Sequence, residues 1–182
     1  MSEKIFETKI DEAYQALKFL LIDSKCRLIS EKEPTGISVI QGSLWGTSPE
    51  TAQKKINFTL TQEKSNTKII GKSALTSSYK NFTVIGYVLS ILLIVIFLWI
   101  SLDLRLYAST GSAGIWSWLG QTSGIMDIDK IAIFSRITEI FTAFLVATMI
   151  FESAIIWNIN RKIHYFAEKK LDSLTVTLQN RF

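Results

Sequence analysis

Three ionisable residues interrupt a stretch of the sequence that is otherwise uncharged and mostly apolar, and they are the first candidates for chemistry. Glu152 stands near the end of residues 131–157, whereas Arg136 and Glu139 stand near the beginning. An acid on the apolar part of a membrane helix is costly, so it predicts a proton or cation path, or a polar contact with a partner helix. The alternative is that Glu152 lies within about one turn of the membrane interface and is solvated.

The other chemistry-bearing residues form none of the patterns typical of enzymes or metal sites. His164, the only histidine, has no cysteine or second histidine near it in the sequence, which argues against a His/Cys metal site. Cys26, the only cysteine, excludes an internal disulfide and is expected to be a small buried hydrophobe in a strand. No nucleophile elbow or phosphate-binding glycine loop is present. We therefore expect no enzymatic activity, no cofactor and no metal.

A first membrane span is predicted at residues 82–100, which contain no charge. At about 1.5 Å per residue this helix is about 28 Å long, close to the ~30 Å of a bilayer's hydrocarbon core. Lys80 precedes the span and Trp99 lies at its far end, as expected at membrane interfaces. The N-terminal residues lack the layout of a signal peptide, so this span is expected to be an uncleaved anchor.

A second span is predicted at residues 137–157. Arg136 at mid-bilayer would cost about 2.5–3.5 kcal/mol, which favours an apolar core beginning just after it. Arg136 and Glu139 then lie near one interface, a helical turn apart, where they can pair or extend toward water. Glu152 falls near the opposite interface, and Trp157 anchors that end.

The distribution of basic residues predicts the orientation of the two spans. Residues 158–182 hold five Lys/Arg against two acids, and residues 1–81 hold twelve against nine. The connection 101–130 holds two Lys/Arg against three acids. Because basic flanks stay in the cytoplasm, we predict a multi-pass protein of the cell membrane, a hairpin with both termini cytoplasmic.

The outer loop predicted at residues 101–130 contains two tryptophans, Trp116 and Trp118, among glycines that include Gly124. Tryptophans in this setting indicate a short segment lying in the membrane interface. The alternative is a binding loop, since loops on rigid scaffolds often carry function.

Residues 1–80 predict a cytosolic α+β domain, an antiparallel meander of four or five strands with one helix on its apolar face. The helix is expected at 11–23. Strands are expected at 5–10, 26–31, 36–45, 55–61 and 67–75, with a bulge in the third and a short helical turn at 47–50. The strict alternation of residues 55–61 is the clearest strand signal. About 80 residues bury only a modest core, so another element is expected to complete it.

A C-terminal amphipathic helix is predicted at residues 158–182, continuing straight out of the second span. Its apolar residues recur at helical spacing from Ile156 to Leu178, with a slip between Phe166 and Leu171. Three destinations are open to it: the sheet of its own chain, a coiled coil with a partner, or the membrane surface. In the first case the hairpin is an insertion within one cytosolic fold.

Three functional hypotheses follow. The leading one is a membrane-tethered cytosolic interaction module, a non-enzymatic adaptor or accessory subunit. Its partners are the lipid bilayer and another membrane protein or a second copy bound through residues 156–178. The alternatives are an oligomeric ion or solute pathway that uses Glu152, and a lipid-binding domain with an apolar pocket under the C-terminal helix. Scattered lysines argue against nucleic acid, and basic groups near the spans, Arg161 and Lys162 among them, are expected to meet anionic headgroups or to set topology.

Overall fold

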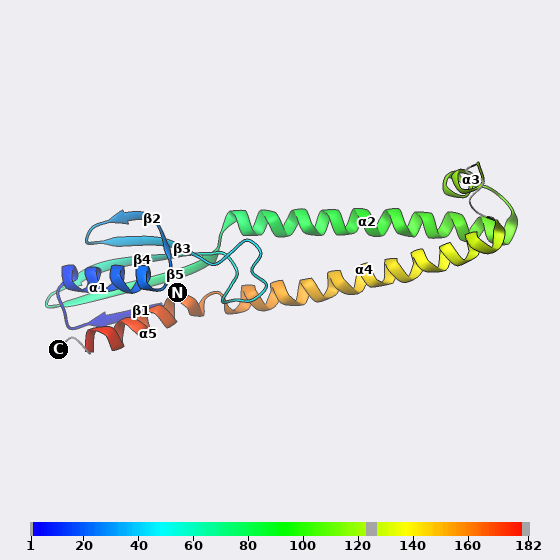
Figure 1. Ribbon diagram of the computed structural model, residues 1–182. Helices are drawn as coiled ribbons and strands as arrows, with labels where there is room; N and C mark the ends of the chain where they lie inside the picture. Colours follow the sequence, from blue (N-terminus) through cyan, green and yellow to red (C-terminus); the bar gives the residue numbers. More distant parts are fainter. Residues whose placement is uncertain (1, 123–126, 180–182) are drawn as a thin grey trace. The chain divides into compact units, whose positions relative to one another are not determined.

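The computed structural model describes residues 2–122 and 127–179. Within these residues the fold is α+β, with one five-stranded antiparallel sheet and five helices (Figure 1). The chain divides into two compact units. The first, here called the sheet domain, comprises residues 1–82 and 155–182, and the second, the helix pair, comprises residues 83–154.

The sheet orders its strands β1-β5-β4-β3-β2, and every neighbouring pair is antiparallel. The strands are β1 (Ser2–Phe6), β2 (Arg27–Lys32), β3 (Gly36–Gln41), β4 (Lys54–Glu63) and β5 (Asn66–Leu75). The alternation predicted in β4 is confirmed, because Ile56, Phe58 and Leu60 are buried whereas Asn57 and Thr59 are exposed. Successive strand residues point to opposite faces, so β4 presents one apolar and one polar face.

The loop after β3 departs from the prediction. The strand expected to reach residue 45 ends at Gln41, because Gly42 turns the chain with a φ of +93°. A Cβ at Gly42 would lie 2.3 Å from the Ala52 carbonyl oxygen, so only glycine fits there. The expected helical turn is a single turn, in which the Ala52 amide donates to the Ser48 carbonyl at 2.8 Å.

The position of a bulge and the end of the first strand also differ from the prediction. The bulge expected in β3 lies in its neighbour β2, where the register shifts between Leu28 and Ser30. The first strand, expected to reach residue 10, ends at Phe6. Helix α1 (Ile10–Asp23) already begins at Ile10. Acidic residues in the first turn of α1 suit the positive end of its dipole.

Helix α1 and the C-terminal helix α5 (Tyr165–Gln179) pack into one hydrophobic core with the sheet (Figure 1). The core takes Tyr14 and Leu17 from α1 and Ile56 from β4, and all three are fully buried. From α5 it takes Leu171 and Leu174, which are equally buried. The first of the three destinations considered for the C-terminal segment, the sheet of its own chain, is therefore the one observed.

The buried stripe of α5 explains the slip in the predicted apolar pattern. The buried residues before and along the helix are Ile163, Ala167, Leu171, Leu174 and Leu178, which recur every three or four residues without interruption. The small Ala167, and not Phe166, faces the sheet. A Cβ added to Gly71 of β5 would lie 2.9 Å from the Ala167 Cβ, so α5 and β5 pass too close for larger side chains or for a pocket at that point.

The C-terminal helix does not continue straight from the second long helix as predicted. Helix α4 (Ile128–Lys162) ends before a turn at residues 163–164, and α5 begins at Tyr165. The Ser73 hydroxyl of β5 donates to the Ile163 carbonyl at 2.5 Å, so the turn is held by the sheet. Hydrogen bonding to a carbonyl freed at a helix end is the usual way to stabilise such a break.

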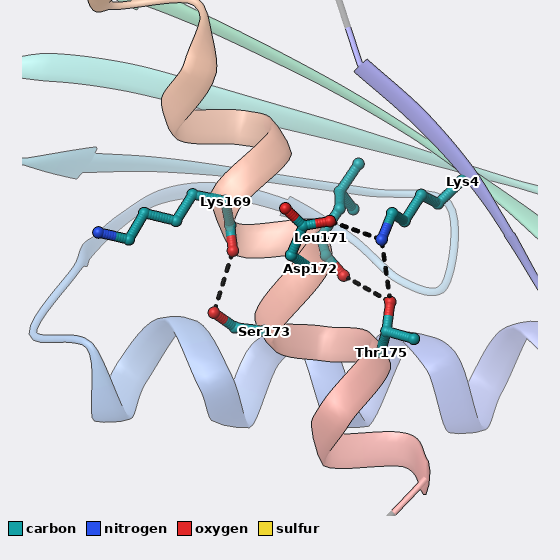
Figure 2. Close-up of polar contacts among 6 residues, drawn as sticks. All are labelled: Lys4, Lys169, Leu171, Asp172, Ser173 and Thr175. Carbon is teal, nitrogen blue, oxygen red and sulfur yellow. Dashed lines mark hydrogen bonds and ion pairs between the residues drawn. The ribbon is translucent and has the colours of Figure 1, made fainter.

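A polar contact fixes the other side of α5 to β1 (Figure 2). The Lys4 ammonium lies 2.6 Å from the Asp172 carboxylate and donates to the Thr175 hydroxyl at 3.3 Å. Thr175 in turn donates to the Leu171 carbonyl at 3.0 Å. The pair is partly exposed, so it sets the position of α5 more than it contributes to stability.

A second buried cluster lies where the sheet domain meets the first turns of helix α2 (Ser77–Thr110) and the last turns of α4, a region here called the base of the sheet domain. It joins Ala52 and Leu75 to Tyr79 of α2, to Ile159 of α4 and to Ile163 in the turn after α4. The first residues of α2 and the last residues of α4 therefore belong to the sheet domain.

Helices α2 and α4 are each long and apolar enough to cross a membrane. With 34 and 35 residues they exceed the ~20 residues that a bilayer core requires. Both predicted spans, 82–100 and 137–157, fall inside them. The expected outer loop is largely helical, since α2 extends to Thr110 and α3 (Ile115–Thr122) follows. Residues 123–126 of that loop, including Gly124, and residues 180–182 of the C-terminal segment lie outside the described residues.

The packing of α5 predicts a measurable effect on stability. Leu171→Ala removes a fully buried side chain and should lower the free energy of unfolding of the sheet domain by about 2–5 kcal/mol. Val176→Ala, on the exposed side of the same helix, should change it by less than about 0.5 kcal/mol. Thermal unfolding of the full chain in mild detergent checks both, and equal effects of the two variants would contradict the packing.

Candidate functional site

The polar residues predicted near the outer interface come together between α2 and α4, but not in the predicted pair. The Glu139 carboxylate lies 3.7 Å from the Arg105 guanidinium of α2, and among the described residues it forms no ion pair with Arg136 of its own helix. Arg136 is exposed. Arg105 was missed because sequence spacing reveals partners on one helix and not on a neighbouring one.

Buried hydroxyl groups lie next to this ion pair. The Ser135 hydroxyl donates to the Ser101 carbonyl at 3.2 Å, and the Thr138 hydroxyl donates to the Ser135 carbonyl at 2.7 Å. Small hydroxyl residues allow helices to approach closely and satisfy polar groups in a membrane. The Ser135–Ser101 hydrogen bond joins α4 to α2 near this ion pair, whereas the Thr138 hydrogen bond stays within α4.

Glu152 lies at the other end of the helix pair and is exposed. Its neighbour Ser153 accepts a hydrogen bond of 2.9 Å from the Tyr87 hydroxyl of α2. Among the described residues no hydrogen-bond or ion-pair partner is found for the Glu152 carboxylate. Arg161 is the ninth residue after Glu152, which is about 13 Å along the helix. Glu152 is therefore more than one turn from the first basic residue that follows it.

Helix α3 is attached to α2 by a carboxylate that the sequence did not single out. Asp103 accepts hydrogen bonds from the backbone amides of Trp116 at 2.7 Å and Ser117 at 3.0 Å, which caps the N-terminus of α3. A Cβ at Gly114 would lie 1.8 Å from the Asp103 carboxylate, so the cap requires glycine there. Trp99 packs edge-on against Trp116, with ring centroids 5.8 Å apart, and Trp118 is exposed.

The predicted interface residues near the sheet domain are exposed. Lys80 lies on the first turns of α2, and Trp157, Arg161 and Lys162 lie on the last turns of α4. The Arg161 guanidinium lies 5.6 Å from the centroid of the Trp157 ring, within reach of a cation–π contact.

Lys54, which the sequence also did not single out, is fully buried at the start of β4. Its ammonium donates to the carbonyls of Pro49 at 2.8 Å and Glu50 at 2.7 Å, and it lies 3.9 Å from the centroid of the Phe166 ring. Burial lowers the pKa of Lys54 to about 8. Phe166, the residue that disturbed the predicted pattern of α5, is thus turned toward Lys54. This contact ties the loop 42–53 to α5.

An exposed apolar surface lies where α1 runs beside β2. The Glu31 carboxylate accepts hydrogen bonds from the Tyr14 hydroxyl and from the Lys18 ammonium, which places β2 against α1. These hydrogen bonds, Lys18 first, hold the pKa of Glu31 below its ordinary value. Leu28 precedes Glu31 on β2, and Ile22 follows Lys18 by one turn on α1, so both lie toward the α1–β2 turn.

The four large apolar side chains of this region are between 42 and 61 % exposed. We call them the edge patch, and they are Phe19, Ile22, Leu28 and Ile29. Leu28 and Ile29 lie on an edge strand, since β2 is the last strand in the sheet order, whereas Phe19 and Ile22 lie on α1. Exposed apolar patches on a folded domain are typical of protein-binding surfaces.

Within the described residues no group of three or more His, Cys, Asp or Glu side chains could hold a metal ion. The sequence matches no known protein-family model and no curated protein.

Proposed function

We propose that the chain is a membrane-tethered interaction module, a non-enzymatic adaptor or accessory subunit of the cell membrane. In this proposal α2 and α4 cross the bilayer as a hairpin and hold the sheet domain at its cytoplasmic face. The sheet domain then binds another membrane protein or a second copy of the chain. The edge patch is the observation that carries the proposal.

The hairpin is supported by the fact that segments before α2 and after α4 contribute to one hydrophobic core. Residues before α2 form the sheet and residues after α4 form α5, and both contribute to the same buried cluster. Two segments that share a core lie on the same side of a membrane, which requires an even number of crossings between them. The two candidate spans meet that requirement. Basic flanks and a slightly acidic connection favour the cytoplasm for the sheet domain.

The edge patch is proposed as the binding surface because the apolar residues of α5 are already buried in the core. The apolar stripe expected to mediate self-association within residues 156–178 is largely buried in the chain's own core. The edge patch remains exposed, and the outer side of β2 offers unpaired backbone groups to a partner strand. A partner that adds a strand at β2 would pair these backbone groups and would bury the edge patch.

Charge placed in the edge patch should weaken this association. Ile29→Lys puts an ammonium group on the edge strand and should weaken binding of the partner or second copy by about tenfold, as expected for a contact worth about 1.4 kcal/mol. The matched control is Ile5→Lys, an exposed isoleucine on the opposite edge strand β1, which should leave association unchanged.

The measurement is chemical cross-linking in native membranes, followed by mass determination of the complex purified in mild detergent. Loss of the complex with Ile29→Lys alone supports the proposal. A wild-type chain that purifies only as a monomer without a partner, or a complex that both variants retain, contradicts it. The melting temperature of each variant shows whether the sheet domain is still folded.

A second candidate function is an oligomeric ion or solute pathway, and the exposed Glu152 carboxylate favours it. Two helices cannot enclose a pore, so several copies would be required. Glu152→Gln should abolish flux through the reconstituted protein, whereas Glu168→Gln on α5 should not. Flux unchanged by Glu152→Gln would exclude this pathway.

A further inference from the structure

The loop 42–53 of the sheet domain contacts the first turns of α2 and the start of α5. The Tyr79 hydroxyl of α2 donates to the Gly46 carbonyl at 2.7 Å. Trp45 stacks edge-on against Phe82 with ring centroids 4.7 Å apart, yet it is 77 % exposed. On the other side the loop reaches α5 through the Lys54 ammonium and the Phe166 ring.

A shallow groove of about 230 Å³ lies beside this loop. Its residues are Pro49, Glu50, Lys162, Tyr165, Phe166 and Lys169. The surface is mostly apolar, and two ammonium groups and one carboxylate line it. Helix α5 begins at Tyr165, so the positive end of its dipole also lies at the groove. Figure 2 shows that Lys169 extends away from the Lys4–Asp172 pair, which leaves its ammonium free of that contact.

The groove lies at the level of lipid headgroups if α4 crosses the bilayer. Lys162 follows Trp157 by five residues, which is about 7.5 Å of helix beyond an interfacial tryptophan. Phe82 is the first residue of the apolar run of α2, so the side chain packed against it lies at the interface too. Trp45 therefore joins the membrane-facing residues although it is 37 residues away from the span in sequence.

We propose that this groove binds the headgroup of an anionic phospholipid, with the phosphate between Lys162 and Lys169 and with Trp45 inserted in the interface beside it. This inference rests on the proposed membrane hairpin. The lipid lies over the Tyr165 and Phe166 rings. The Lys162 and Lys169 charges outnumber the single Glu50 carboxylate, so the groove favours a phosphate monoester or diester that carries no compensating amine. Lys54 does not take part because the Pro49 and Glu50 carbonyls already occupy its ammonium.

The test compares two double variants of the full chain in lipid nanodiscs. Lys162→Gln with Lys169→Gln removes the groove charges. The control, Lys55→Gln with Lys72→Gln, removes two exposed charges from neighbouring strands elsewhere on the sheet domain. The probe is phosphatidylglycerol mixed into phosphatidylcholine, and the readout is the phosphatidylglycerol that stays bound after transfer to detergent, measured by native mass spectrometry.

We expect the groove variant to retain less than half of the phosphatidylglycerol that the wild type retains, and the control to retain all of it. Equal retention by the two double variants overturns the site. Trp45→Phe should reduce the fluorescence intensity that brominated lipids quench, while the quenching of the other interfacial tryptophans remains; an unchanged loss of intensity overturns the insertion of Trp45. Inorganic phosphate should not displace the lipid, and displacement at equal concentration shows a free-phosphate site instead and overturns the lipid assignment.

Failure of the hairpin itself is distinguishable. A chain that alkaline carbonate releases from membranes lacks the proposed anchor, whatever its groove binds. A chain that stays in the membrane, with the groove variant and the control indistinguishable, retains the anchor and lacks the lipid site.

Discussion

The structure depends on the packing of α5 against a sheet that is complete in sequence before the first long helix begins. The contact is close: Ala167 lies against Gly71, and the Ser73 hydroxyl holds the turn that precedes α5. Residues far apart along the chain thereby form one core. The two long helices are an insertion in the sheet domain, and the positions of their ends are set by the cluster around Tyr79 and Ile159.

This constraint connects architecture to the proposed function. Because α5 and α1 together cover one face of the sheet, the apolar stripe of α5 is used internally, whereas the edge patch stays exposed. Because the helix bases are part of the sheet domain, the loop 42–53 meets them directly and brings Trp45 to Phe82. The proposals for anchoring, partner binding and lipid contact thus concern three separate regions of one small chain.

Much of the fold could be predicted from local patterns. Strand β4, helix α1 and both apolar helices follow from periodicity and composition, which act over short segments. Residues whose surroundings come from distant segments could not be assigned in this way. Lys54 lies on the same buried face of β4 as Ile56. Its contacts with Pro49 and Phe166 explain why a lysine is tolerated there.

The same limit applies to the candidate site. Arg136 was the expected partner of Glu139 because it lies one turn away, whereas the observed partner, Arg105, comes from the neighbouring helix. Asp103 caps α3 from thirteen residues away, and Gly114 gives the only local sign of that contact. The strand pattern does not reveal the edge patch, because the place of β2 at the sheet edge depends on the final strand order.

The central claim is that one domain is interrupted by a membrane hairpin, and cysteine accessibility tests it most directly. In a Cys26→Ser background, single cysteines replace exposed serines at Ser65 before β5, Ser112 between α2 and α3, and Ser173 on α5. A membrane-impermeant maleimide applied to intact cells should label the cysteine at 112 and should reach those at 65 and 173 only after lysis. Labelling of 65 and 173 on opposite sides of the membrane, or of all three positions on the same side, would contradict the account.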